Sequence, residues 1–213
     1  MAEFTGWDDE FKKFFDGLGR DNSKDYFEAH RELFRRAVRE PAEALVAALE
    51  PRYGAGRVFR LDRDLRFSAD RRPYHTRIGI EFDDSGCHHY VSASATELTV
   101  SVGIHRADRQ WVERFRRAVD GPAGGALLAI VEDLEARGIT IGGQRLRTAP
   151  RGVPADHPHI RLLRHRSLTA DRTWPASAWL GGPGVLDLIT GAWDRAAPLR
   201  NWLTHHQSGW SPT

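Results

Sequence analysis

The chain has 213 residues, of which 40% are hydrophobic and 28% charged, a composition typical of a soluble globular protein. Its net charge is only +2. The single cysteine, Cys87, excludes an intrachain disulfide and a cysteine-based zinc site. A membrane-spanning helix is not expected, because the sequence contains no run of about 18 apolar residues. The acidic N-terminal residues do not resemble a signal peptide, so we expect a cytoplasmic protein without membrane association.

The first fifty residues are predicted to be helical. In the first helix the apolar residues recur with helical spacing at Phe11, Phe14, Phe15 and Leu18. Asn22 or Ser23 can cap a second helix, because short polar side chains accept hydrogen bonds from the first free N–H groups of a helix. Pro41 should kink or divide this helix, and Pro51 with Gly54 should end it.

From Val58 the hydrophobic period changes from 3.6 to 2, which predicts a four-stranded antiparallel meander over about 58–104. Its first strand, 58–67, has one apolar face and one charged face, the latter formed by Arg60, Asp62, Asp64 and Arg66. Residues 68–74 should form a loop to a second strand with Ile78, Ile80 and Phe82 on its apolar face. The segments HYVSASA and ELTVSVGI supply the third and fourth strands.

The second half of the chain returns to helices with short extended pieces. Asp108 should cap one helix and Pro122 should lie in the first turn of another. ITIGGQRLR has the pattern of a hairpin or extended pair around Gly142–Gly143. A short helix from about His159, capped by Asp156, is followed by an extended segment.

The run GVLDLITGAWDRAAPLRNWLTHH completes the chain as one helix interrupted by Pro198, or as two helices. The element order predicts a single α+β domain in which N- and C-terminal helices cover one side of the antiparallel meander.

Positive charge is concentrated between Arg57 and Arg77, where seven arginines and three aspartates give +4, although the whole chain carries only +2. Arginine suits phosphate or carboxylate because its planar fork binds two oxygens and stays charged. The candidate ligand-binding residues are Arg60, Arg63, Arg66, Ser68, Arg72 and Tyr74, together with Arg151 and Arg164 from a second basic segment. If that segment packs near the hairpin, one basic pocket would result.

Three residues of the same stretch are candidates for catalysis. Asp64 or Asp70 could orient the arginine forks or act as a base. His75 is the best candidate for proton transfer, because its ordinary pKa lies near 6.5 and surrounding arginines would lower it and keep the ring neutral.

The stretch FRLDRDLRFSADRRPYHT resembles the signature R-x-x-R-D-x-R-F-S-x-D-x-x-P-Y-[KH]-T of a widespread bacterial and fungal domain family of unknown function. NSKDYFEAHRELF, PRGVPADHPHIRLLRH and APLRNWL resemble further segments of that family. The resemblance covers nearly the whole chain and implies a conserved hypothetical protein with a single domain over 1–213. His75 stands where many members carry Lys, which favours a shared role as cation or hydrogen-bond donor.

Three interpretations remain open at this point. The arginines bind a small anionic ligand, a phosphate ester or carboxylate, with or without catalysis. Alternatively, the basic hairpin is a non-enzymatic module for nucleic acid or protein, although a net charge near zero counts against a large DNA footprint. In the third interpretation the arginines are internal ion pairs. We expect no cofactor and no metal, since neither a P-loop nor a trusted His or Cys ligand spacing occurs.

Overall fold

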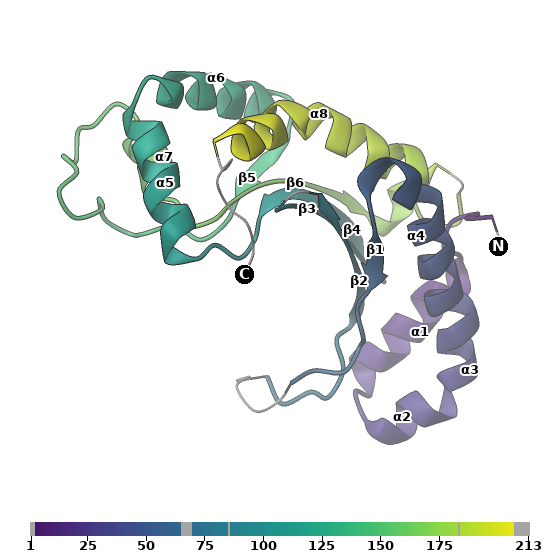
Figure 1. The fold of residues 1–213 in the computed structure, drawn as a ribbon. Helices are drawn as coiled ribbons and strands as arrows, with labels where there is room; N and C mark the ends of the chain where they lie inside the picture. The colour runs from purple at the N-terminus through teal and green to yellow at the C-terminus, as the bar shows by residue number, and fades with distance from the viewer. Residues whose placement is uncertain (1–2, 65–69, 85, 183, 207–213) are drawn as a thin grey trace. The chain divides into compact units, whose positions relative to one another are not determined.

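The structure is a computed structural model that describes residues 3–64, 70–84, 86–182 and 184–206 (Figure 1). Its contacts divide the chain into two compact units. Unit 1 comprises Met1–Asp83, His89–Val100 and Thr173–Gly191, and unit 2 comprises Asp84–His88, Ser101–Arg172 and Ala192–Thr213. The expectation of a single domain stays a prediction.

The strands form one sheet in the order β1-β2-β3-β4-β6-β5. Their bounds are β1 (Gly56–Val58), β2 (Arg77–Asp84), β3 (Cys87–Ser94), β4 (Glu97–Ile104), β5 (Thr140–Gly142) and β6 (Leu168–Pro175). The first four strands are consecutive neighbours, which confirms the predicted meander and the α+β class. Two further strands extend the sheet beyond β4.

The predicted alternation of β2 is confirmed, because Ile78, Ile80 and Phe82 are buried whereas Arg77 is exposed. On β3 and β4 the predicted apolar positions are at most 3% exposed: Val91, Ala93, Leu98, Val100, Val102 and Ile104. Ser92, Ser101 and Gly103 between them are buried as well, so burial does not alternate in these parts of the two strands. In each unit, helices pack against one face of its strands (Figure 1). The apolar sheet face therefore forms the core in both units.

The predicted first strand is mostly wrong, since β1 ends at Val58 and only the single bridge Asp62↔Tyr74 follows in the described residues. The last pair of the β1–β2 ladder is Val58 with Ile80. Three residues lie between Val58 and Asp62, whereas five lie between Tyr74 and Ile80 on the partner segment. These two extra residues interrupt the ladder, as a bulge does.

The segment nevertheless stays antiparallel to the chain before β2. The backbone N–H of His75 donates to Leu61 O and that of Arg63 donates to Pro73 O, both at 2.8 Å. Leu65, Arg66 and Phe67 of the predicted strand lie outside the described residues.

The predicted hairpin around Gly142–Gly143 is also wrong. β5 pairs with β6 instead, with Ile141 opposite Ala170, and the single bridge Arg145↔His165 continues this pairing beyond Gly143 (φ +103°). Asp156 does not cap the following helix, whose first turn receives no side-chain cap.

The helical elements are α1 (Asp9–Arg20), α2 (Lys24–Ala29), α3 (Arg31–Phe34), the π-helical η1 (Arg35–Arg39), α4 (Glu40–Tyr53), α5 (Arg109–Asp120), α6 (Ala123–Ala136), α7 (Ile160–Leu163), the 3-10 turn η2 (Ala176–Ala178) and α8 (Val185–His205). The predicted division near Pro41 is a π-helical turn immediately before α4. α8 is one helix that contains Pro198. Among the helices of the described ranges, none is both long and apolar enough to cross a membrane.

Two helix caps agree with the sequence. Ser23 Oγ accepts the N–H of Tyr26 at 3.1 Å, and Asp108 Oδ1 accepts the N–H of Trp111 at 2.6 Å. Each cap satisfies a backbone donor that the first turn of a helix leaves without a partner.

Gly17 lets α2 pack against α1. The Tyr26 hydroxyl donates to Phe14 O at 3.1 Å, and a Cβ at Gly17 would lie 1.9 Å from that hydroxyl. Tyr26 therefore lies across the bare backbone of Gly17, and this close approach fixes the start of α2.

We expect Gly17→Ala to destabilise the protein by about 1–3 kcal/mol, because the new methyl must displace Tyr26 from Phe14 O. Gly19→Ala in the same helix is the matched control, since no atom lies within 4 Å of its Cβ position. Replacing a helical glycine there should be neutral or stabilising by about 0.5–1 kcal/mol. Urea unfolding measures the stability of both variants. Equal free energies of unfolding would contradict the close packing of Tyr26 on Gly17.

Candidate anion-binding site

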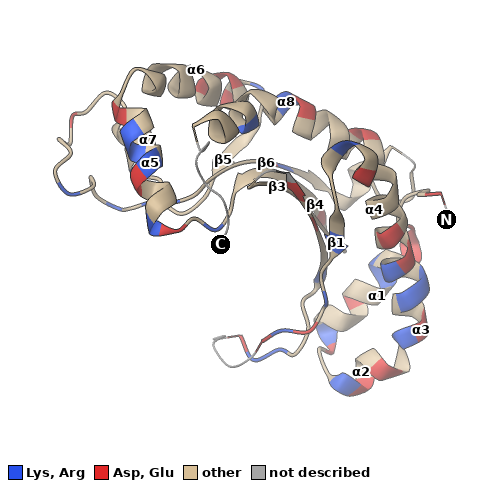
Figure 2. Cartoon of the chain, viewed as in Figure 1, with Lys and Arg blue, Asp and Glu red and all other residues tan. Residues whose placement is uncertain are grey.

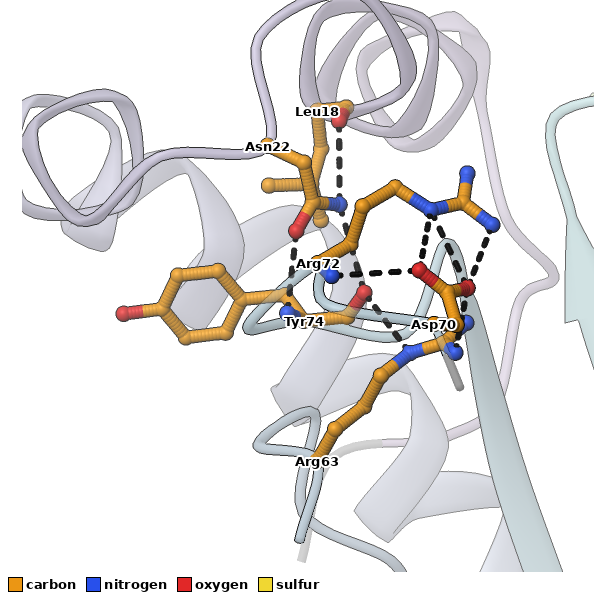
Figure 3. A network of polar contacts seen from close by, with 6 residues as sticks. All are labelled: Leu18, Asn22, Arg63, Asp70, Arg72 and Tyr74. Carbon is orange, nitrogen blue, oxygen red and sulfur yellow. Dashed lines mark hydrogen bonds and ion pairs between the residues drawn. The ribbon is translucent and has the colours of Figure 1, made fainter. Parts of the chain in front are cut away.

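The residues between Arg60 and Arg77 contain a carboxylate shared by two guanidinium groups (Figure 3). Asp70 Oδ2 lies 2.6 Å from Arg63 Nη1 and 2.7 Å from Arg72 Nη2. Asp70 Oδ1 also accepts the backbone N–H of Arg72 at 3.1 Å. We call Arg63, Asp70 and Arg72 the arginine–aspartate triad.

The triad keeps Asp70 ionised. Hydrogen bonds from Arg72, together with the charge of Arg63, hold the pKa of the Asp70 carboxyl far below its ordinary value. A carboxylate of such low basicity is a poor proton acceptor at neutral pH. The geometry therefore favours the orienting role considered for Asp70 over the role of a base.

The backbone of Tyr74 is held by Asn22, which lies at the end of α1 (Figure 3). Asn22 Oδ1 accepts the N–H of Tyr74 at 2.9 Å, and Asn22 Nδ2 donates to Tyr74 O and to Leu18 O, each at 3.2 Å. Arg63 Nε donates to the same Tyr74 carbonyl at 3.2 Å. One asparagine thus joins α1 to the triad.

The sequence pattern predicts Asn22 only as a possible helix cap. Ser23 performs that capping, which leaves the Asn22 side chain available for Tyr74. The one sequence signal for another role of Asn22 is that Asn22 and Ser23 are adjacent, whereas the helix needs only one cap. The partner, 52 residues away, is fixed only by tertiary packing.

The Tyr74 ring belongs to the core. It is 7% exposed and stacks on Phe27 with ring centroids 4.6 Å apart. Burial, and secondarily the charge of Asp62, raises the pKa of the Tyr74 hydroxyl. This placement favours a positioning role over the ligand contact predicted for Tyr74.

His75 is half-buried beside the triad. Burial lowers the pKa of His75, and the charges of Arg63 and Arg77 lower it further, against a smaller opposite effect of Asp70. Both effects favour the neutral imidazole, and the expected lowering by arginines is the smaller of the two.

The remaining arginines of the stretch divide into two groups. Arg57 pairs with Glu81 across the β1–β2 ladder, as expected for a surface ion pair. Arg60, Arg71 and Arg77 are exposed and make no side-chain hydrogen bond or ion pair within the described ranges. The ion-pair interpretation thus applies to part of the cluster and leaves a surplus of cations.

Two of the predicted site residues cannot be placed, because Arg66 and Ser68 lie outside the described residues. Asp64 is exposed and has interaction partners. Arg151 and Arg164 belong to unit 2, and a pocket shared with the hairpin residues stays a prediction.

Arg164 is committed to the backbone of unit 2. Its Nε donates to Leu146 O at 2.8 Å and its Nη2 donates to Arg147 O. Arg151 is exposed and makes no side-chain hydrogen bond or ion pair with any residue that the structure describes.

His165, next to Arg164, is a core residue. Its side chain is fully buried, and Nδ1 lies 3.0 Å from the carbonyl oxygen of Ser167, so the neutral ring donates from Nδ1. Burial lowers the pKa of His165 to about 4. In the described part of the chain, no group of three or more His, Cys, Asp or Glu side chains could hold a metal ion.

A shallow hollow of about 410 Å³ lies along the exposed face of α1, and sequence analysis did not single it out. It is lined by Asp9, Lys12, Lys13, Asp16, Gly17, Arg20 and Tyr26. Except for Tyr26 of α2, these residues recur with helical spacing along α1, so the hollow is a charged helix face beside the contact of Tyr26 with Gly17.

We expect Asn22→Ala to destabilise the protein by about 1–3 kcal/mol, because the N–H and C=O of Tyr74 lose their partner. Amide hydrogen exchange at residues 70–75 should accelerate more than exchange in α6. Asn201→Ala, at an exposed asparagine whose side chain hydrogen-bonds only to Arg200 among the described residues, should leave both quantities unchanged. Equal effects of the two substitutions would contradict the role of Asn22.

His165 should make stability depend on pH. Between pH 6.5 and 4 the histidine binds a proton in the unfolded chain but stays neutral in the folded protein. The free energy of unfolding therefore falls by about 3 kcal/mol as the pH drops through this range. His165→Asn retains a donor near Nδ1 and should remove this part of the pH dependence.

His206→Asn is the matched control, because His206 also lies beside a backbone carbonyl but is only partly buried. Urea unfolding at pH 7, 5.5 and 4.5 measures the effect. An unchanged slope in His165→Asn would contradict the assignment of the buried neutral ring.

The sequence profile of the family described as conserved hypothetical protein (DUF2461) matches residues 10–202. The match begins within α1, ends within α8 and includes the whole triad. A comparison with curated proteins found no match. The match covers far more than half of the chain and agrees with the resemblance seen in the sequence. The chain therefore belongs to the conserved hypothetical protein family DUF2461.

Proposed function

We propose that the protein binds a small anion, a phosphate ester or a carboxylate, on the guanidinium groups of Arg63 and Arg72. The observation that carries this proposal is the sharing of Asp70, because two cations face one carboxylate within the triad. An anion placed beside both guanidinium groups would balance that charge.

Hydrogen-bond donors remain available for such an anion. Arg72 uses Nε and Nη2 toward Asp70, and Arg63 uses Nε and Nη1 toward Tyr74 and Asp70. Arg72 Nη1 and Arg63 Nη2 are left without partners among the described residues. Guanidinium N–H groups form strong, often bidentate hydrogen bonds with phosphate and carboxylate oxygens.

The arginines are also held in place before any ligand arrives. The Arg63 side chain is only 18% exposed, and Asn22 fixes the carbonyl to which it donates. Fixing a side chain in advance lowers the entropy cost of binding, which raises affinity. Asp70 thus acts as the orienting group of the site.

His75 supplies a neutral polar group beside these cations. Its lowered pKa keeps the imidazole uncharged at pH 7, so it can donate or accept a hydrogen bond. In the proposed site it donates to an anion oxygen, a role that the Lys of other family members would share.

We expect inorganic phosphate or a phosphate monoester to stabilise the protein against heat. At ten times Kd the gain is about 1.4 kcal/mol, which raises Tm by roughly 3–5 °C for a chain of this size. Succinate, tested in parallel at matched ionic strength with chloride as reference, separates a carboxylate ligand from a phosphate ligand. Differential scanning fluorimetry measures the shift.

Arg72→Gln should abolish the shift, because it removes one guanidinium group while leaving Arg63 attached to Tyr74. Arg35→Gln is the control, since Arg35 is similarly exposed and pairs with Glu32 on a helix of the same unit. The proposal fails if no anion raises Tm, or if Arg72→Gln responds like Arg35→Gln.

A further inference from the structure

The net charge near zero conceals an asymmetry between the two units. Unit 2 contains fifteen arginines and ten acidic residues, a net charge of +5. Unit 1 contains sixteen basic and nineteen acidic residues, a net charge of −3. The charge argument against a polyanionic partner therefore does not apply to unit 2.

One segment accounts for the whole excess of unit 2. The connection from Gly143 to Ser167, between β5 and β6, holds six arginines and a single acidic residue, Asp156. Figure 2 shows basic positions spaced along the loop of this connection. We call residues 143–167 the basic connection.

Two arginines of the basic connection maintain its structure. Arg164 donates to the carbonyl oxygens of Leu146 and Arg147, and Arg161 pairs with Glu135 of α6. The backbone is tied further, since Leu146 N–H donates to Arg164 O at 2.8 Å. The connection is thus held against unit 2 by several polar contacts.

The other four arginines have no internal role. Arg145, Arg147, Arg151 and Arg166 are exposed and make no side-chain hydrogen bond or ion pair with the described residues. Burial, and secondarily the charge of Arg166, lowers the pKa of the neighbouring Arg116. We call these four residues the free arginines.

We propose that the free arginines bind the phosphate backbone of a nucleic acid. All four residues belong to unit 2, and none of them is a member of the triad of unit 1. Arg145 and Arg147 are two residues apart on a segment that bridges to His165, a step of about 7 Å in extended chain. Binding one small ion requires several cationic side chains to converge on one point. Cations spaced along a connection instead match the spaced phosphates of a polymer.

An acidic protein is a poorer match. The basic connection contains no Phe, Tyr or Trp, although protein interfaces depend on a few buried aromatic or arginine anchors in an apolar centre. Phosphate contacts alone suffice for binding to nucleic acid without sequence preference. We therefore expect binding that depends on salt and not on base sequence.

Fluorescence anisotropy of labelled duplex DNA of about 20 base pairs, titrated with the full chain at 50 to 200 mM NaCl, tests this inference. The free-arginine variant carries Arg145→Gln, Arg147→Gln, Arg151→Gln and Arg166→Gln. We expect its Kd at 50 mM NaCl to rise at least about tenfold, and the salt slope of log Kd to fall by about 3.6, as the loss of four phosphate contacts requires.

The matched control removes the same charge from arginines that have partners. Arg31, Arg35, Arg36 and Arg39 all pair with glutamates of unit 1, and their joint replacement by Gln should leave DNA binding unchanged. Arg72→Gln should also bind DNA normally, which keeps this inference independent of the small-anion site.

Three outcomes would overturn the inference. The first is wild-type affinity in the free-arginine variant, and the second is an equal loss in the paired-arginine control. The third is displacement of DNA by polyglutamate more readily than by unlabelled DNA of equal charge, which would identify an acidic protein as the better occupant. Circular dichroism confirms that each variant is folded, as expected for substitutions at exposed positions.

Discussion

The hydrogen bonds between Asn22 and the backbone of Tyr74 connect most of what is specific to unit 1. They join the end of α1 to the chain that precedes β2, and the Tyr74 carbonyl that they fix also accepts from Arg63. Arg63 in turn holds Asp70. Buried and half-buried polar groups of this kind are costly when unsatisfied, so the network permits one arrangement of the segment and discourages others.

The same arrangement explains how a charged cluster can be both structural and available to a ligand. Asp70 neutralises only one of the two guanidinium groups that it touches, and each group keeps donors that no described residue uses. Internal pairing orients the arginines, and incomplete pairing leaves them able to attract an anion. Unit 2 shows a similar division, in which Arg161 and Arg164 secure the basic connection and the free arginines remain exposed.

Regular elements were predictable where one local period dominated. The apolar alternation of β2 to β4 and the capping residues Ser23 and Asp108 follow from side chains that act within a few positions of one another. The predicted first strand was mostly wrong because the chain between Tyr74 and Ile80 has two more residues than the chain between Val58 and Asp62, which interrupts the ladder. A difference in length between two paired segments becomes visible only when the pairing is known, and the hydrophobic pattern of neither segment reveals it.

The sequence by itself determined the α+β class, the meander, the family and the concentration of arginine between Arg57 and Arg77. Tertiary structure alone decided that Asn22 holds Tyr74, that Asp70 is shared by two arginines and that four arginines of the basic connection have no side-chain partner among the described residues. The physical reason is range: periodicity and capping act over a few residues, whereas hydrogen-bond partners and charge balance depend on which distant segments meet.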